Sequence, residues 1–187
     1  KQLFDNKSST YTYIISSGKG REALIIDPVI ESTSEYLKIL KELDLKLVKV
    51  IDTHIHADHI TGLGALRDST HCITVMGENS SVDVVSMRVA EGDCINIEGI
   101  TLKALYTPGH TDDSYCFLSG DRVFTGDTLL IRGTGRTDFQ NGSCKDQYYS
   151  IFDRLLKLPE ETLVYPSHDY RGKKVVLFFY PLDFTFV

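Results

Sequence analysis

Short strand-like runs and a few helical segments share the hydrophobic positions of this chain. Aromatic and β-branched residues predict strands over 11–15 and 22–27, and the small polar residues between them indicate a hairpin turn. Leucines recurring at every third position predict a helix over 32–44. The nearly continuous apolar run that follows predicts a buried strand over 45–52.

The rest of the chain adds short strands and one long helical segment. Apolar spacing predicts a helix over 145–158, with Pro159 just beyond it, and a shorter helix is expected from near His59 through Leu66. Further strands are predicted over 72–76, 94–97, 101–106, 115–118, 122–125 and 162–165. Because strands and helices are mixed rather than strictly alternating, the pattern favours an α/β layered sandwich with mixed sheets over a doubly wound parallel sheet.

Composition narrows the class of protein. The chain has 187 residues, 42% of them hydrophobic, which suits one globular domain with its own core. Its 20 basic and 26 acidic side chains give a net charge of −6 without a basic stripe, so we expect no nucleic-acid partner. The longest apolar run, near 175–180, is far shorter than the ~20 residues that a membrane-spanning helix needs, so no membrane partner is expected either.

The cysteines indicate the compartment. Cys72, Cys94, Cys116 and Cys144 form no Cys-x-x-Cys pair, and no secretory signal pattern precedes them. We therefore expect buried free thiols in a reducing compartment, which favours the cytoplasm. The mitochondrial matrix is the alternative if a targeting segment has been removed.

Candidate ligands for a metal ion follow several predicted strands. The segment 53–59 packs three histidines and one aspartate behind a buried strand, and His110, Asp127 and His168 each follow another strand. Imidazole nitrogen and carboxylate oxygen bind Zn²⁺, Fe²⁺ and Mn²⁺. Side chains two residues apart diverge, so part of the 53–59 segment is expected at one site and the rest at a second site or around the ligands.

Other polar residues have simpler interpretations. His71 is interpreted as an ordinary surface or core histidine. Asp27 and Asp52 end predicted strands and are interpreted as turn residues or as groups that orient ligands. The glycine pair in 133–136 lacks the rest of a phosphate-loop motif and indicates a tight turn.

The run His54-Ile55-His56-Ala57-Asp58-His59, followed by His110, Asp127 and His168, resembles the metallo-β-lactamase superfamily. That resemblance implies an αββα sandwich with two mixed β-sheets and a metal site at one edge of both. Four segments, 9–13, 56–62, 129–140 and 165–170, are similar to the persulfide dioxygenase (sulfur dioxygenase) family, which is close to glyoxalase II. The stretch 131–140 is the specific part of this resemblance, because ordinary glyoxalase II enzymes differ there. The resemblance covers roughly residues 2–172.

This family resemblance implies one Fe²⁺ per chain, held by His54, His110 and Asp127, and a reaction of glutathione persulfide with O₂ and water that gives sulfite and glutathione. Four other side chains match ligands of the dinuclear hydrolases and are expected to stay off the iron: His56, Asp58, His59 and His168. One or two Zn²⁺ ions remain an alternative, because the same seven residues fit a zinc pair.

The resemblance also implies substrate contacts. Arg136 and Tyr170 match positions that contact glutathione in glyoxalase II enzymes. The alternatives are a buried ion pair of Arg136 with Asp138 or another acidic residue, and a core or loop role for Tyr170. Two other functions are kept open: a dinuclear glyoxalase II-type hydrolase of glutathione thioesters, and a non-enzymatic redox or metal-binding module.

The end of the sequence departs from the family. Residues 1–172 are interpreted as the metallo-β-lactamase-fold domain, and 173–187 as a divergent apolar tail. The tail resembles the peroxiredoxin strand that leads to the peroxidatic cysteine, but it contains no cysteine. The C-terminal part of the sandwich is therefore expected to be incomplete, and a homodimer is left open.

Overall fold

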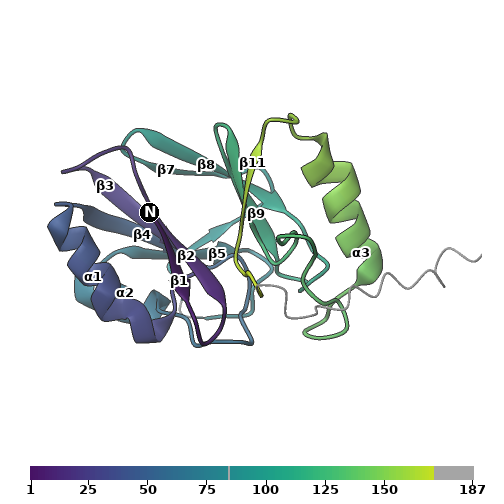
Figure 1. Ribbon diagram of the computed structural model, residues 1–187, viewed down its shortest axis with the longest axis horizontal. Coiled ribbons are helices and arrows are strands. Elements are labelled where there is room, and N and C mark those ends of the chain that lie inside the picture. The colour runs from purple at the N-terminus through teal and green to yellow at the C-terminus, as the bar shows by residue number, and fades with distance from the viewer. Residues whose placement is uncertain (84, 171–187) are drawn as a thin grey trace, which may run out of the picture.

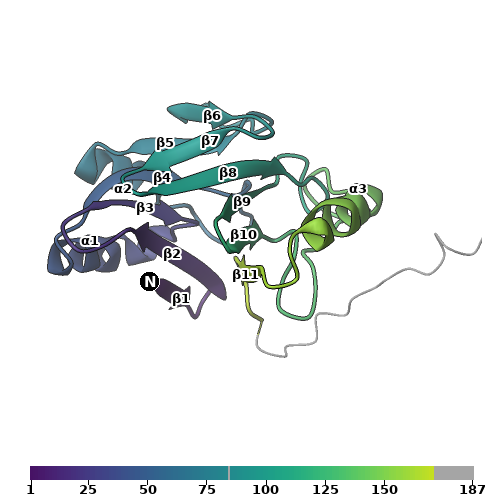
Figure 2. The ribbon, with the colours of Figure 1, turned by 90° about the horizontal axis from the view of Figure 1, so that it is seen from above.

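Two β-sheets face each other in the middle of the molecule, with helices on both outer sides (Figures 1 and 2). The computed structural model describes residues 1–83 and 85–170, and the apolar tail over 173–187 lies outside the described residues. The layers run helix, sheet, sheet, helix, and each sheet mixes parallel and antiparallel pairs. The predicted αββα sandwich with two mixed sheets is confirmed.

The first sheet has six strands in chain order. They are β1 (Gln2–Asp5), β2 (Thr10–Ser16), β3 (Glu22–Ile26), β4 (Lys46–Ile51), β5 (Ile73–Gly77) and β6 (Met87–Val89). β1, β2 and β3 pair antiparallel, as the predicted hairpin requires, whereas β3 to β6 run parallel. The carboxyl ends of β3 and β4 therefore meet at one edge of the sheet.

The second sheet has five strands in the order β11-β10-β9-β8-β7. They are β7 (Cys94–Ile97), β8 (Ile100–Tyr106), β9 (Tyr115–Ser119), β10 (Arg122–Gly126) and β11 (Leu163–Pro166). Among the strands of this sheet that lie in the described residues, β10 and β11 pair in parallel and the other neighbours are antiparallel. Both of these strands end beside each other, so the residues that follow them are brought together.

Three groups of apolar side chains hold the layers together. The inner faces of the sheets meet through residues such as Leu24, Ile51, Leu102 and Phe117. Helices α1 (Thr33–Glu42), preceded by a 3₁₀ turn at Ile30–Ser32, and α2 (Leu63–Thr70) cover the first sheet. Helix α3 (Cys144–Tyr149) continues through a π-helical stretch, Ser150–Arg154, and a 3₁₀ turn, Leu155–Lys157, and covers the second sheet.

Helix α2 begins four residues later than predicted. The residues before it are already used in tertiary hydrogen bonds: the Ile30 N–H donates to the Ile60 carbonyl (2.9 Å), and the Gly62 N–H donates to the Pro28 carbonyl (2.7 Å). These bonds hold 59–62 against the end of β3, so the helix starts only at Leu63. The two edge strands of the first sheet, β1 and β6, were not predicted from the sequence.

The prediction of buried free thiols is confirmed for two of the four cysteines. All four cysteines are free, and Cys72 and Cys116 are buried. Cys94 and Cys144 are exposed, which contradicts the expectation of buried thiols. Cys94 lies on β7, the last strand of the second sheet, where alternate side chains face solvent.

Within residues 1–83 and 85–170, no helix has the length and apolar character needed to cross a membrane.

Candidate metal centre

The predicted metal ligands come from loops that leave different strands at one edge of the sandwich. His54 follows β4 of the first sheet, and His110 lies in the loop between β8 and β9 of the second. Asp127 follows β10, and His168 follows β11. Residues as distant as 54 and 168 are therefore brought to the same place by the parallel strand ends.

His54, His110 and Asp127 form one compact donor set. One ligand atom from each lies within 4.8 Å of those from the other two. The His110 Nε2 is 3.6 Å from the Asp127 Oδ2, and the rings of His54 and His110 stand nearly perpendicular with centroids 4.9 Å apart. This spacing suits three atoms that share one ion.

Each of these two histidines uses its Nδ1 in a protein hydrogen bond. The His110 Nδ1–H donates to the Arg136 carbonyl oxygen at 2.7 Å. The His54 Nδ1 lies 2.9 Å from the Thr53 hydroxyl, which itself donates to the Asp27 carboxylate at 3.0 Å. Such bonds fix the tautomer and leave the Nε2 lone pairs for a metal, so the donor set fits a bound ion.

A second donor set lies beside the first. Ligand atoms of His56, Asp58 and His59 also lie within 4.8 Å of one another. The His56 Nδ1 and the His59 Nε2 are buried and have no hydrogen-bond partner among the described residues. Residues 54 and 56 thus serve different sets, as the divergence of alternate side chains predicts, although their ring centroids are 4.2 Å apart.

His168 joins the two sets. Its Nδ1 is 2.5 Å from the Asp127 Oδ1, and its Nε2 is 2.9 Å from the Asp58 Oδ2. Burial opposes the charge on this ring, but the two carboxylates outweigh burial and raise the pKa of His168 to about 10. The same contact holds the pKa of Asp127 well below its usual range, against the effect of burial.

Burial and neighbouring charges separate the other two histidines. Burial and the nearby His56 hold the pKa of His54 well below its usual value, so this imidazole is neutral and able to bind a metal. For His56 burial acts in the same direction, but Asp27 and Asp52 outweigh it and raise the pKa to about 9. Burial raises the pKa of Asp52 itself to about 7.

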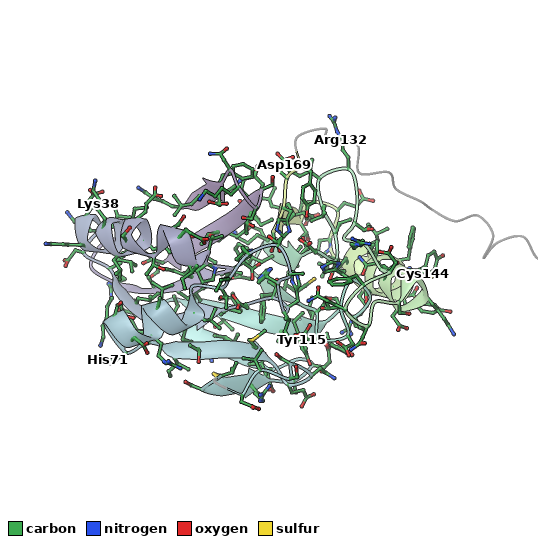
Figure 3. The ribbon with its side chains drawn as sticks, turned by 90° about the horizontal axis from the view of Figure 1, so that it is seen from below. Lys38, His71, Tyr115, Arg132, Cys144 and Asp169 are labelled. Carbon is green, nitrogen blue, oxygen red and sulfur yellow. The ribbon has the colours of Figure 1, made fainter. Side chains whose placement is uncertain are left out.

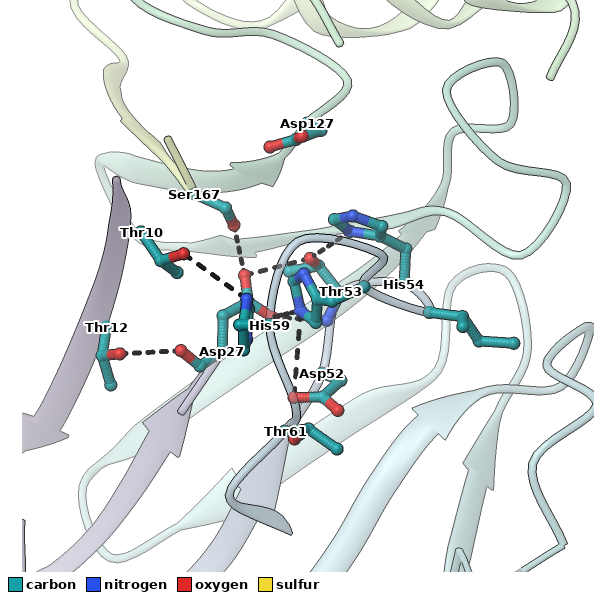
Figure 4. A network of polar contacts seen from close by, with 12 residues as sticks. Thr10, Thr12, Asp27, Asp52, Thr53, His54, His59, Thr61, Asp127 and Ser167 are labelled. Atoms are coloured by element: carbon teal, nitrogen blue, oxygen red, sulfur yellow. Dashed lines mark hydrogen bonds and ion pairs between the residues drawn. The ribbon is translucent and has the colours of Figure 1, made fainter. Parts of the chain in front are cut away.

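Asp27 accepts hydrogen bonds from several residues around the site (Figure 4). Its backbone has a φ of 51° and its side chain is fully buried. The carboxylate accepts from the Thr53 N–H at 2.7 Å, from the Ser167 hydroxyl and from the His56 Nε2 at 3.2 Å. Asp27 therefore connects the loop after β4 with the loop after β11, in keeping with its interpretation as a ligand-orienting residue.

Comparison with known proteins identifies the family. A model of the metallo-beta-lactamase superfamily matches residues 6–83 and 88–168. The chain is 43% identical over 178 residues to the Mus musculus persulfide dioxygenase ETHE1, mitochondrial, covering 94% of this chain and 70% of that protein. The crystal structure of ETHE1 from Myxococcus xanthus superposes with a TM-score of 0.89 at 51% identity, covering 92% of this chain and 76% of that chain. The chain belongs to the persulfide dioxygenase family.

The glyoxalase II side of the resemblance is more distant. A probable hydroxyacylglutathione hydrolase of Schizosaccharomyces pombe is 33% identical over 171 residues, covering 88% of this chain and 66% of that protein. The resemblance to persulfide dioxygenases, drawn from the histidine motifs and from 131–140, is therefore confirmed.

The two substrate-contact candidates lie in different surroundings in this family member. The Arg136 side chain forms a two-pronged ion pair with Asp138, with N–O distances of 2.7 and 3.0 Å. Both side chains are largely exposed, at 65% and 72%, so the alternative of a buried ion pair is wrong on burial. The half-buried Tyr170 ring stacks on His168, with centroids 5.4 Å apart and an angle of 9° between the planes.

His71 lies away from this centre. It is exposed, ends helix α2 with a φ of 59°, and is far from Asp169 in Figure 3. Its interpretation as an ordinary histidine agrees with this position. The tight turn lies slightly earlier than predicted: backbone hydrogen bonds between Leu130 and Gly133 close it over 130–133, and 134–136 extend beyond it.

Sequence reasoning missed several residues that support the ligands. Thr53 and Ser167 each directly precede a histidine of the site, and that adjacency is the only signal the sequence offered. Asp113, whose carboxylate accepts from the Ile55 N–H at 3.2 Å, carried no signal of its own. Gln140, whose amide donates to the Ile55 carbonyl, stood out only as the last residue of the family-like stretch 131–140.

Proposed function

We propose that this chain is a persulfide dioxygenase that oxidises glutathione persulfide with O₂ and water to sulfite and glutathione. The observation that carries the proposal is the 51% identity and 0.89 TM-score to the ETHE1 structure. The donor set of two histidines and one carboxylate agrees with it, because this set leaves open positions and is typical of non-haem iron(II) oxygenases.

One Fe²⁺ per chain would be held by His54, His110 and Asp127. The ion would supply redox chemistry with O₂ at its open positions. Asp27, through Thr53, and the Arg136 carbonyl hold the two imidazoles by their Nδ1 atoms, which leaves each Nε2 for the ion. His168 holds the other oxygen of Asp127 and so limits this carboxylate to one direction.

The protein also has to hold the persulfide. Arg136 offers a guanidinium that pairs two-pronged with a carboxylate, and here that carboxylate is Asp138. A glutathione carboxylate would exchange with Asp138 at this exposed position. Tyr170, stacked on His168, offers a hydroxyl beside the centre for a second polar contact. Binding at these points would place the persulfide sulfur next to the ion.

A dinuclear hydrolase of glutathione thioesters is the second candidate. One observation favours it, namely the second donor set of His56, Asp58 and His59 with its two unpartnered nitrogens. In such an enzyme, metal-bound hydroxide would be the nucleophile. The contact of His168 with both Asp127 and Asp58 argues for the first candidate, because it uses His168 to orient carboxylates.

One experiment separates the two. The purified chain is loaded anaerobically with Fe²⁺ or with Zn²⁺, its metal content is measured, and each form is assayed for O₂ uptake with glutathione persulfide and for hydrolysis of S-lactoylglutathione. We expect one iron per chain and O₂ uptake with sulfite as product. Two zinc ions per chain with thioester hydrolysis and no O₂ uptake would contradict the proposal, and binding of a metal with neither activity would support a non-enzymatic module.

The names of the relatives bear on the compartment in which this chain works. The mouse, bovine and human relatives are named mitochondrial, which favours the mitochondrial alternative over the cytoplasm. A homodimer stays a prediction that sedimentation of the purified chain tests.

A further inference from the structure

The loop over residues 130–142, here called the 130–142 loop, touches all three segments that carry the first donor set. Most of this stretch, 131–140, carries the resemblance to the persulfide dioxygenase family. Three hydrogen bonds join it to the donor segments: the Gly135 N–H to the Asp127 carbonyl at 2.7 Å, the His110 Nδ1–H to the Arg136 carbonyl at 2.7 Å, and the Gln140 amide to the Ile55 carbonyl at 3.0 Å. The 130–142 loop is therefore hydrogen-bonded to each of the three segments that carry the first donor set.

Ile55 is the residue at which the two donor sets separate. His54 on one side of it belongs with His110 and Asp127, whereas His56 on the other side belongs with Asp58 and His59. Both polar groups of Ile55 are held by side chains. Its N–H donates to the Asp113 carboxylate at 3.2 Å, and its carbonyl accepts from the Gln140 amide at 3.0 Å.

These two bonds fix the orientation of the peptide groups on both sides of Ile55. Rotation of either peptide would turn one imidazole away from its set, since the direction of a side chain follows its backbone. Asp113 comes from the loop that carries His110, and Gln140 from the loop that follows Asp127. The 54–56 segment is therefore held by the same two loops that supply the partner ligands of His54.

Gln140 is also held in an uncommon conformation. Its φ is 47° and that of the next residue, Asn141, is 57°, both in the left-handed region that non-glycine residues seldom adopt. The Asn141 amide donates to the Asp112 carboxylate at 3.1 Å, and the Ser143 N–H donates to the Gly109 carbonyl at 2.8 Å. These bonds hold the turn that brings the Gln140 amide to Ile55.

We propose that Gln140 is a positioning residue for the metal centre, which acts through the Ile55 carbonyl, together with Asp113 on the Ile55 N–H, to fix the segment 54–56 and with it the directions of the His54 and His56 imidazoles. Gln140 bonds none of the three donors itself. The inference rests on the proposed metal role of His54, His110 and Asp127.

The test replaces Gln140 with methionine, which keeps the length of the side chain and removes the amide. Co²⁺ is titrated into the metal-free chain in competition with a chromophoric chelator, and the visible absorption of bound Co²⁺ is recorded. We expect the Co²⁺ affinity to fall about 10-fold, within the range for lost ligand-orienting contacts, and the absorption bands to shift. With saturating Fe²⁺, kcat should fall while the KM for glutathione persulfide stays unchanged.

Two further variants complete the design. Gln140→Glu keeps the shape but cannot donate when ionised, so it should behave like Gln140→Met. Gln2→Met makes the same replacement at an exposed position of β1 and should bind Co²⁺ like the unaltered chain. Co²⁺ affinity and absorption within twofold of the unaltered chain in both Gln140 variants would overturn the inference, as would loss of the whole fold in both.

The Co²⁺ measurement separates this inference from the proposed function. An unaltered chain that binds Co²⁺ tightly but oxidises no persulfide when loaded with Fe²⁺ would contradict the proposed function alone. An unaltered chain that binds no Co²⁺ would overturn both.

Discussion

Small hydroxyl side chains decide how the histidines of this centre are presented. Thr10, Thr53 and Ser167 lie against imidazoles or against the carboxylate of Asp27 beneath them. A hydroxyl can donate one hydrogen bond and accept another. A hydroxyl held by a buried carboxylate can therefore accept from an imidazole N–H and fix the orientation of that ring. The centre is thus shaped by residues that a search for metal-binding side chains would not find.

Thr53 gives the most direct test of this effect. Thr53→Val keeps the side-chain shape and removes the hydroxyl between Asp27 and His54. We expect Fe²⁺ affinity to fall about 10-fold or more, because His54 loses its orienting partner. Metal content after dialysis against a graded chelator series measures the change. Thr101→Val, at an exposed position of β8, is the control, and equal iron retention in both variants would contradict the role of Thr53.

Gly135 tests how closely the 130–142 loop approaches the ligands. A Cβ at this position would lie 2.6 Å from the Asp127 carbonyl and 2.6 Å from the His110 Nδ1, which is closer than real Cβ contacts. Gly135→Ala should therefore displace His110 or Asp127 and abolish most persulfide oxidation in an O₂-electrode assay.

Gly64 in helix α2 provides the matched control for that replacement. A Cβ there meets nothing within 4 Å. Gly64→Ala should keep its activity and gain about 0.5–1 kcal/mol in the free energy of unfolding, because alanine is the better helix former. Full activity in Gly135→Ala would show that the loop can retreat from the ligands.

At the scale of elements, the strands that lead to the centre and the long helix could be predicted from the pattern of apolar residues. The start of an element could not be predicted where it depends on tertiary hydrogen bonds. The strands that end at the centre were all predicted within one or two residues. The start of α2 was not, because the Ile60 carbonyl and the Gly62 N–H bond to residues about 30 positions earlier. The Gln140–Ile55 contact spans 85 positions, and only the folded chain brings these residues together.

Leu155 tests how the helical layer of the second sheet is held. It is 6% exposed and packs with Leu105, Cys116 and Val123, whereas its neighbour Leu156 is 58% exposed. Leu155→Ala should lower the free energy of unfolding by about 2–4 kcal/mol, and Leu156→Ala should change it by less than about 0.5 kcal/mol. Urea unfolding monitored by circular dichroism gives both values. Similar values for the two variants would mean that this helix is not anchored through Leu155.

At the scale of the whole molecule, the proposed metal centre lies where the two sheets meet. His54 follows a strand of the first sheet, whereas His110 and Asp127 belong to loops of the second. An ion held by all three would join the two sheets directly. Within the described residues, Asp27 to Ser167 and Asp113 to Ile55 are further contacts across this junction. The site and the stability of the sandwich are therefore coupled.

Metal removal tests that coupling. A ligand that binds only the folded chain stabilises it according to its free concentration, so Fe²⁺ at 100 times its dissociation constant should add about 2.7 kcal/mol to the free energy of unfolding. Adding a chelator anaerobically should lower the midpoint of thermal unfolding of the unaltered chain. His54→Ala removes the ligand from the first sheet and should unfold at nearly the same temperature with and without the chelator. A midpoint of the unaltered chain that ignores the chelator would mean that no ion spans the sheets, because an ion bound by both must be released before they separate.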